Sequence, residues 1–137
     1  MNFENGAIGT ILTSFDVWSS NLPCIEIYGT EGSISVPDPN GFGGAVKLRR
    51  MNNSEWKEMP LSHGYTDNYR GIGVADMAYA IRSGRPHRSS GELGNHVLEA
   101  MHAFHISSDT EKLYRMTSRV ERPAALPIGL LNGVLDA

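Results

Sequence analysis

Apolar and polar residues alternate along the first half of the chain, which predicts a β-sheet. The alternation over 24–28 (CIEIY) and 33–36 (SISV), either side of the turn 29–32 (GTEG), predicts a β-hairpin. Similar patterns predict further strands over 45–50 and 55–59. Because successive side chains point to opposite faces of a strand, one face should be apolar and include Ile25, Ile27, Ile34, Val36, Val46 and Leu48.

The opposite face of this sheet looks small and neutral, with Cys24, Tyr28, Ser33 and Ser35. A face in contact with water usually carries more lysine and glutamate. A neutral face therefore favours contact with a partner subunit through the open sheet. An ordinary exposed face rich in serine is an equally good interpretation.

Residues 7–15 predict one more strand, because they mix β-branched and small residues with apolar ones. The dipeptide Asn5-Gly6 before them is typical of a hairpin turn. Only four residues precede that turn, so the partner strand is nearly absent. We therefore expect a segment upstream of this chain.

A helical period replaces the alternation in the second half. The first helix is expected from about Asp67 to Ser83, ending at Gly84 with Pro86 beyond it. It has two apolar sectors, which predicts that it is covered on two sides. One sector holds Val74, Met77 and Ile81, and the other holds Ile72, Ala75 and Tyr79.

The second helix is expected to start at Ser89 or Ser90, where Ser89 and Glu92 would complete a capping box. Residues 112–116 could then return to the sheet as a short strand, and 124–137 form a tail. The elements together predict an α+β, two-layer domain. Its sheet would be open, mixed and mostly antiparallel, with two main helices packed on one face.

Composition narrows the class of protein. The chain has 137 residues, 40% hydrophobic and 20% charged, which fits one folded domain and excludes a disordered chain. A net charge of −3 argues against nucleic acid and against a membrane-binding basic patch. One cysteine, Cys24, excludes an internal disulfide. No segment has the pattern of a signal peptide or a membrane span, so a cytoplasmic location is expected.

The segment 71–76 (GIGVAD) resembles the start of a dinucleotide-binding loop. Asp76 replaces the third glycine, and no strand leads into the segment. An aspartate there would place a carboxylate against the pyrophosphate. The glycines therefore favour close helix packing rather than cofactor binding.

Two further groups of residues could carry chemistry. Glu92, His96 and Glu99 share one stripe of the second helix and could bind zinc or iron or exchange protons, although a solvated helix face is the favoured interpretation. The loop 85–88 (RPHR) is basic and could hold an anionic or hydroxylated ligand, with an exposed loop as the alternative.

The loop 14–21 (SFDVWSSN) combines an aromatic ring, an acid and short polar groups. Such a mixture suits a carbohydrate, because the ring can stack and the polar groups can bond hydroxyls. The alternative is a capped loop with one buried tryptophan.

Five segments in order resemble the C-terminal domain of the glucose–fructose oxidoreductase, inositol dehydrogenase and MocA family. They are 3–10 (FENGAIGT), 25–32 (IEIYGTEG), 36–40 (VPDPN), 70–77 (RGIGVADM) and 84–93 (GRPHRSSGEL), before His96-Val97-Leu98-Glu99. The resemblance covers residues 1–123.

The resemblance implies a domain that shapes a substrate site and forms a homo-oligomer. A separate Rossmann domain, absent from this chain, would bind NAD or NADP, and a sugar, inositol or related polyol would be oxidised or reduced by hydride transfer. The substrate-binding residues expected here are Asp16, Trp18, Ser19, Asn21, Tyr69, Arg70 and His87.

The family's catalytic Glu-Lys-Pro lysine and its Asp-x-x-x-His motif have no counterpart in this sequence. Residues 111–113 (EKL) lack the proline and lie near the C-terminus. We therefore assign no catalytic residue, and we expect the isolated chain neither to bind a nicotinamide cofactor tightly nor to turn over sugar. Alternatives are a stand-alone carbohydrate-binding or assembly module and, from its glutamate and histidine stripe, a small metalloenzyme.

Overall fold

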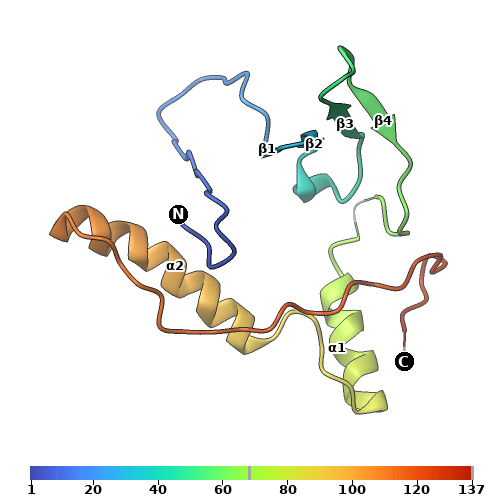
Figure 1. The fold of residues 1–137 in the computed structure, drawn as a ribbon. Coiled ribbons are helices and arrows are strands. Elements are labelled where there is room, and N and C mark those ends of the chain that lie inside the picture. The colour runs from blue at the N-terminus through green and yellow to red at the C-terminus, as the bar shows by residue number, and fades with distance from the viewer. Residues whose placement is uncertain (68, 137) are drawn as a thin grey trace.

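The computed structural model describes residues 1–67 and 69–136, and it has the predicted α+β composition (Figure 1). Its elements are β1 (Ile25–Gly29), β2 (Gly32–Val36), the short 3-10 helix η1 (Pro39–Gly41), β3 (Val46–Arg50), β4 (Lys57–Met59), α1 (Ile72–Ser83) and α2 (Gly91–Thr110). Within these ranges no helix has both the length and the apolar character needed to cross a membrane.

The four strands form one sheet in the order β1-β2-β3-β4, with each strand antiparallel to the next. The register pairs Ile27 with Ile34 and Ile34 with Leu48, and it pairs Ile25 with Val36. The apolar residues therefore share one face, as the alternation predicts. All pairings among the described strands are antiparallel, so the sheet is not mixed.

The opposite face is charged, which corrects the prediction of a neutral surface. Glu26 pairs with Ser35, Ser35 with Lys47, and Lys47 with Glu58, so acidic and basic side chains cross the sheet in one row. The sequence interpretation considered only the first two strands. Because β3 and β4 add ionic side chains, this face supplies no argument for a partner subunit.

The predicted strand over residues 7–15 does not form. Asn2 and Ile8 make one isolated bridge, and the Ala7 N–H donates to Asn5 Oδ1 at 3.0 Å. The turn at Gly6, with a φ of 86°, is therefore present without a strand after it. A strand needs a partner edge, and residues 9–14 pair with no described strand.

Helix α1 begins at Ile72 rather than at Asp67. The preceding chain is occupied by turns, with Tyr65 at a φ of 60° and the Ile72 N–H bonded to Tyr69 O at 2.9 Å. The predicted stop is confirmed, since Gly84 has a φ of 75° and its N–H donates to Ala80 O at 2.8 Å.

Helix α2 is capped by Ser90, whose Oγ accepts from the Leu93 N–H at 3.2 Å. The capping box predicted at Ser89 is therefore wrong. Residues 112–116 are not a strand but an extended segment. This segment returns along α2, to which side-chain hydrogen bonds hold it.

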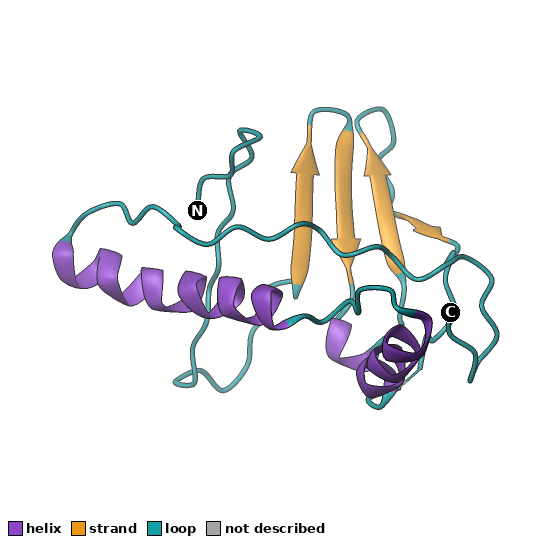
Figure 2. Cartoon of the chain, turned by 90° about the horizontal axis from the view of Figure 1, so that it is seen from below, coloured by secondary structure: helices purple, strands orange, loops and turns teal. Residues whose placement is uncertain are grey.

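Both helices lie on the same side of the sheet, but neither packs closely against it (Figures 1 and 2). Among the described elements, only neighbouring strands contact one another extensively. The expected packing of both helices on a sheet face is therefore absent. Exposed fractions of 41%, 54% and 37% remain at Ile25, Ile27 and Ile34.

Loops connect the sheet to the helical part. A Cβ added to Gly43 would lie 1.9 Å from Thr66 O, so the two backbones touch there. Arg70 also donates to Asn40 Oδ1 at 2.6 Å. These contacts join the loop after β2 to the loop before α1, and they set the position of α1.

Candidate functional site

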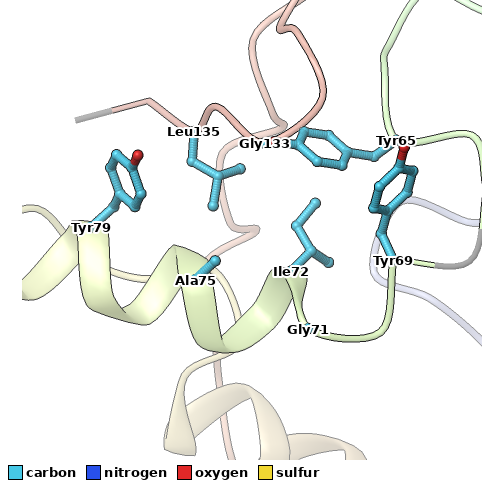
Figure 3. A pocket seen from close by; sticks show the side chains of 8 residues that line it. All are labelled: Tyr65, Tyr69, Gly71, Ile72, Ala75, Tyr79, Gly133 and Leu135. Carbon is cyan, nitrogen blue, oxygen red and sulfur yellow. The ribbon is translucent and has the colours of Figure 1, made fainter.

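A cavity of about 220 Å³ lies between α1 and the end of the chain (Figure 3). We call it the tyrosine pocket, and its walls include Tyr65, Tyr69, Ile72, Ala75, Tyr79 and Leu135. Tyr65 and Tyr69 stand at one end and Tyr79 at the other, with Ile72 and Ala75 of α1 between them and Leu135 opposite. Aromatic and aliphatic carbon forms most of this wall.

Tyr65 organises one end of the tyrosine pocket. Its ring stands edge-on to the ring of Tyr69, with centroids 5.0 Å apart and an angle of 86°. Its hydroxyl donates to Val134 O at 2.6 Å, which ties the tail to the loop before α1. A φ of 60° is unusual for a tyrosine, so surrounding contacts must hold this backbone in place.

Two arginines and two aspartates form a cluster that we call the arginine latch: Asp76, Arg85, Arg88 and Asp136. Arg85 Nη2 donates to Asp76 Oδ1 at 2.8 Å, and Arg88 Nη1 donates to the same oxygen. Arg88 Nη2 donates to Asp136 Oδ2 at 2.8 Å. The latch thus joins α1, the loop after it and the tail.

Asp76 is the most completely engaged member of the latch, with only 4% of the residue exposed. Its second oxygen accepts from the Arg88 backbone N–H at 2.8 Å. Burial alone would raise the pKa of this carboxyl, but the hydrogen bonds from Arg88 and Arg85 outweigh burial and lower it. The Arg88 guanidinium likewise lowers the pKa of Asp136.

The arginine latch changes the interpretation of two sequence motifs. The loop 85–88 was expected to offer an anion site or to be exposed, yet the side chains of Arg85 and Arg88 are each 18% exposed and already paired with carboxylates. In the segment 71–76, Asp76 serves the latch, and a Cβ at Gly71 or Gly73 would have nothing within 4 Å. Close packing therefore does not explain these glycines.

A second cluster engages the stripe of glutamate and histidine on α2. Glu99 accepts from the Thr117 N–H at 2.6 Å and the Ser118 N–H at 2.8 Å, and also from Tyr114 Oη at 3.1 Å. His96 Nδ1 lies 2.8 Å from Ser118 Oγ. Hydrogen bonds from Ser118 and Thr117 lower the pKa of Glu99.

These contacts make His96 and Glu99 a clasp for the segment after α2, whereas Glu92 of the same stripe is exposed. Both oxygens of Glu99 already accept hydrogen bonds. Across residues 1–67 and 69–136, no group of three or more His, Cys, Asp or Glu side chains is placed to hold a metal ion.

The loop 14–21 lies far from α1 in both ribbon views (Figures 1 and 2). Its own hydrogen bonds are local, from the Asp16 N–H to Ser14 Oγ at 3.1 Å and from the Leu22 N–H to Ser20 Oγ at 3.1 Å. The loop is capped, but Trp18 is fully exposed rather than buried.

The seven predicted substrate residues therefore occupy three places. Asp16, Trp18, Ser19 and Asn21 belong to the exposed loop, Tyr69 lines the tyrosine pocket, and Arg70 contacts Asn40 beside it. His87 lies half-buried between the two arginines of the latch.

Nothing in the sequence around Tyr65 or Leu135 marks them as pocket residues. Tyr65 is an isolated tyrosine in a loop, and Leu135 lies in a tail without periodicity. The nearest available signal was the set of three tyrosines at 65, 69 and 79, two before the first helix and one within it.

Comparison with protein-family models, with curated proteins and with solved structures finds no match to this chain.

Proposed function

We propose that the chain is the C-terminal substrate-binding and oligomerisation domain of a cytoplasmic, NAD(P)-dependent sugar or polyol oxidoreductase. In this proposal a Rossmann domain and a second copy of this chain are its partners. The observation that carries the proposal is the amount of apolar surface left uncovered.

The chain exposes 11635 Å² of surface. A compact monomer of 15.0 kDa exposes roughly 7,000 Å². The excess includes the apolar face of the sheet, where Ile27 is 54% exposed, and the outer sector of α1, where Val74 is 73% exposed. Exposed apolar surface on this scale is typical of chains whose partners cover it.

The substrate proposal uses the loop 14–21. The Trp18 ring is open on the surface and could stack against the C–H face of a sugar ring. Asp16, Ser19 and Asn21 supply acceptors and donors for hydroxyl groups within the same turn of chain. Tyr69, Arg70 and His87 lie on the α1 side, away from this loop, so the substrate proposal rests on the loop alone.

This chain does not fit the nicotinamide cofactor. When bound, that cofactor supplies or accepts a hydride, but the segment 71–76 offers it no cradle. Described residues before Gly71 form turns rather than a strand, and the carboxylate of Asp76 is engaged with arginine. Cofactor binding is therefore assigned to the separate Rossmann domain, and no catalytic step is assigned to residues of this chain.

Sedimentation velocity on the purified chain, over a range of concentrations, tests the assembly role. Ile27→Glu places a charge on the apolar face of the sheet and should weaken self-association about tenfold or more. Lys47→Glu changes the charge on the opposite face and is the matched control. A chain that stays monomeric at all concentrations, or equal effects of both substitutions, would contradict the proposal.

A titration with myo-inositol, followed by the indole N–H resonance of Trp18, tests the substrate role. The resonance should shift on binding, and Asp16→Ala should weaken the binding. The indole of Trp56, in the turn before β4, is the internal control. An unchanged Trp18 resonance would exclude this loop as the sugar site of the free chain.

A further inference from the structure

The tyrosine pocket has a mostly apolar lining, which a site for a polyol does not need. Apart from Tyr69, its walls are not used by the proposed function. We propose that it binds a single aromatic ring carrying one hydrogen-bonding substituent, and that residues 131–136 are its lid, held closed by the arginine latch.

The volume of the pocket is sufficient for a ligand with one ring. A buried apolar cavity of about 150 Å³ is enough to bind benzene. The tyrosine pocket, at about 220 Å³, adds space for one or two substituent atoms.

The wall chemistry favours an aromatic ring. Tyr65, Tyr69 and Tyr79 present ring faces and edges, and Ile72, Ala75 and Leu135 present aliphatic carbon. A polyol would bring many hydroxyl groups to this wall, and each one left without a partner would reduce affinity.

Two tyrosine hydroxyls of the pocket could nevertheless form a hydrogen bond with a ligand. The hydroxyl of Tyr65 already donates to Val134 O at 2.6 Å. The hydroxyls of Tyr69 and Tyr79 have no hydrogen-bond partner in the described part of the chain. Figure 3 shows these two residues at opposite ends of the cavity, so a ring with one polar substituent could bond either of them.

The lid, residues 131–136, covers one side of the pocket and is attached by hydrogen bonds from the arginine latch. Leu135 is 6% exposed and forms the wall opposite α1, and Gly133 lies beside it with a φ of 85°. Arg85 Nη2 donates to Asp136 O at 3.0 Å, and Arg88 Nη2 bonds the side chain of Asp136.

The two aspartates of the latch are not equally held. Both oxygens of Asp76 accept hydrogen bonds, whereas Asp136 Oδ1 is buried without a hydrogen-bond partner, 3.7 Å from Arg85 Nη2. The side chain of Asp136 is therefore held less completely than that of Asp76, although the carbonyl oxygen of Asp136 also accepts from Arg85 at 3.0 and 3.3 Å. We infer that the lid opens by separation of Asp136 from the arginines while Asp76 keeps them on α1.

The test is a titration of the full chain with p-cresol, followed by the backbone amide resonances. The amides of Gly71, Ala75 and Gly133 should shift together. Ala75→Leu fills the cavity and should weaken p-cresol binding about tenfold. Val74→Leu enlarges an apolar side chain on the exposed side of α1 and should leave binding unchanged.

Two further measurements keep the test informative if Ala75→Leu does not fold. Tyr79→Phe together with Tyr69→Phe removes both available hydroxyls, so p-cresol should lose its advantage over toluene. Asp136→Asn should speed hydrogen exchange at the amide of Leu135 and weaken binding, because the lid is released. The control Asp109→Asn changes an exposed aspartate on α2 and should do neither.

The proposal is overturned if p-cresol shifts no amide of the pocket, or if toluene and p-cresol bind the double tyrosine variant with the same preference as the unmodified chain. It is also overturned if myo-inositol shifts the pocket amides more strongly than p-cresol, because the pocket would then be a polyol site. None of these outcomes depends on self-association or on the Trp18 loop.

Discussion

Around α1, side chains join parts of the chain that are far apart in sequence, whereas the sheet joins neighbours in sequence through backbone hydrogen bonds. Arg85 reaches Asp136 across 51 residues, and Tyr65 reaches Val134 across 69. In the sheet each strand pairs with the next one along the chain.

The difference appears in what each region buries. The α1 region contains the buried residues Asp76, Ala80, Leu135 and Tyr65, while the apolar face of the sheet stays open. Regular strands can thus form from local pairing, but they gain little hydrophobic stabilisation until another surface covers them. The α1 region supplies its own cover from the tail.

The largest effect is expected from Asp76→Ala. The substitution removes the carboxylate shared by Arg85 and Arg88 and leaves two partly buried cations without it. The free energy of unfolding should fall by about 3 kcal/mol, the lower end for a broken buried pair because both arginines keep some contact with water. Urea unfolding followed by circular dichroism measures the change, with Asp109→Ala as the control. Equal effects of the two substitutions would show that the latch contributes little.

Gly43→Ala should disrupt the contact between the sheet and the α1 region. The added Cβ would lie 1.9 Å from Thr66 O, so the loop after β2 must move away from the loop before α1. A loss of about 1–3 kcal/mol is expected, as for other overpacked contacts. Gly41→Ala is the control, because a Cβ there meets nothing within 4 Å. If both variants unfold at the same urea concentration, the two loops are not packed as described.

A smaller effect is expected at the start of α2. Ser90→Ala removes the cap of the Leu93 N–H and should cost about 1 kcal/mol, whereas Ser89→Ala should have almost no effect. Thermal unfolding of both variants decides between the cap in the structure and the capping box that the sequence suggested. A larger loss for Ser89→Ala would contradict the structure.

A fall in pH should destabilise the α1 region, because the two aspartates of the arginine latch become protonated. The pKa values of Asp76 and Asp136 are lowered in the folded chain, so both carboxylates stabilise it above the ordinary aspartate pKa, near 4. That stability should begin to fall near this pH and be lost as the pH drops through the lower folded values. Urea midpoints measured down this range should fall less steeply in Asp136→Asn than in the unmodified chain. Equal slopes would mean that Asp136 is not paired in solution.

The smallest change is expected from Glu99→Gln, which should act locally. The amides of Thr117 and Ser118 lose a charged acceptor and should exchange with solvent faster, while the rest of the chain is unaffected. Hydrogen exchange followed residue by residue provides the measurement, and Glu121→Gln is the control. Unchanged exchange at both amides would show that Glu99 does not hold the segment after α2.

The predicted parts of the fold are those with local causes. The alternation around Ile27 and Ile34 located β1 and β2, and Gly84 located the end of α1, because pairing faces and helix stops depend on a few neighbouring residues. The false strand over 7–15 shows the limit of this approach. Its composition suits a strand, but strand formation also needs a partner edge that sequence pattern does not reveal.

The candidate sites were predicted only in part for a related reason. Tyr69 was identified, but its neighbours Tyr65 and Leu135 were not, since no spacing links a loop, a helix and a tail. Arg85 and Arg88 were recognised as a basic loop. Their carboxylate partners come from α1 and from the tail, and a linear sequence does not show which charges meet.

The sequence by itself determined the α+β class, the order of the four paired strands and two helices, and the apolar face of the sheet, but it also predicted two strands that do not form. The tertiary structure alone decided which charges pair in the latch, where the pocket lies, and which apolar faces stay open. Periodicity and turn chemistry act over a few residues, so they can be read along the chain. Burial and ion pairing depend on which distant segments meet, as when Asp136 returns to the arginines beside α1.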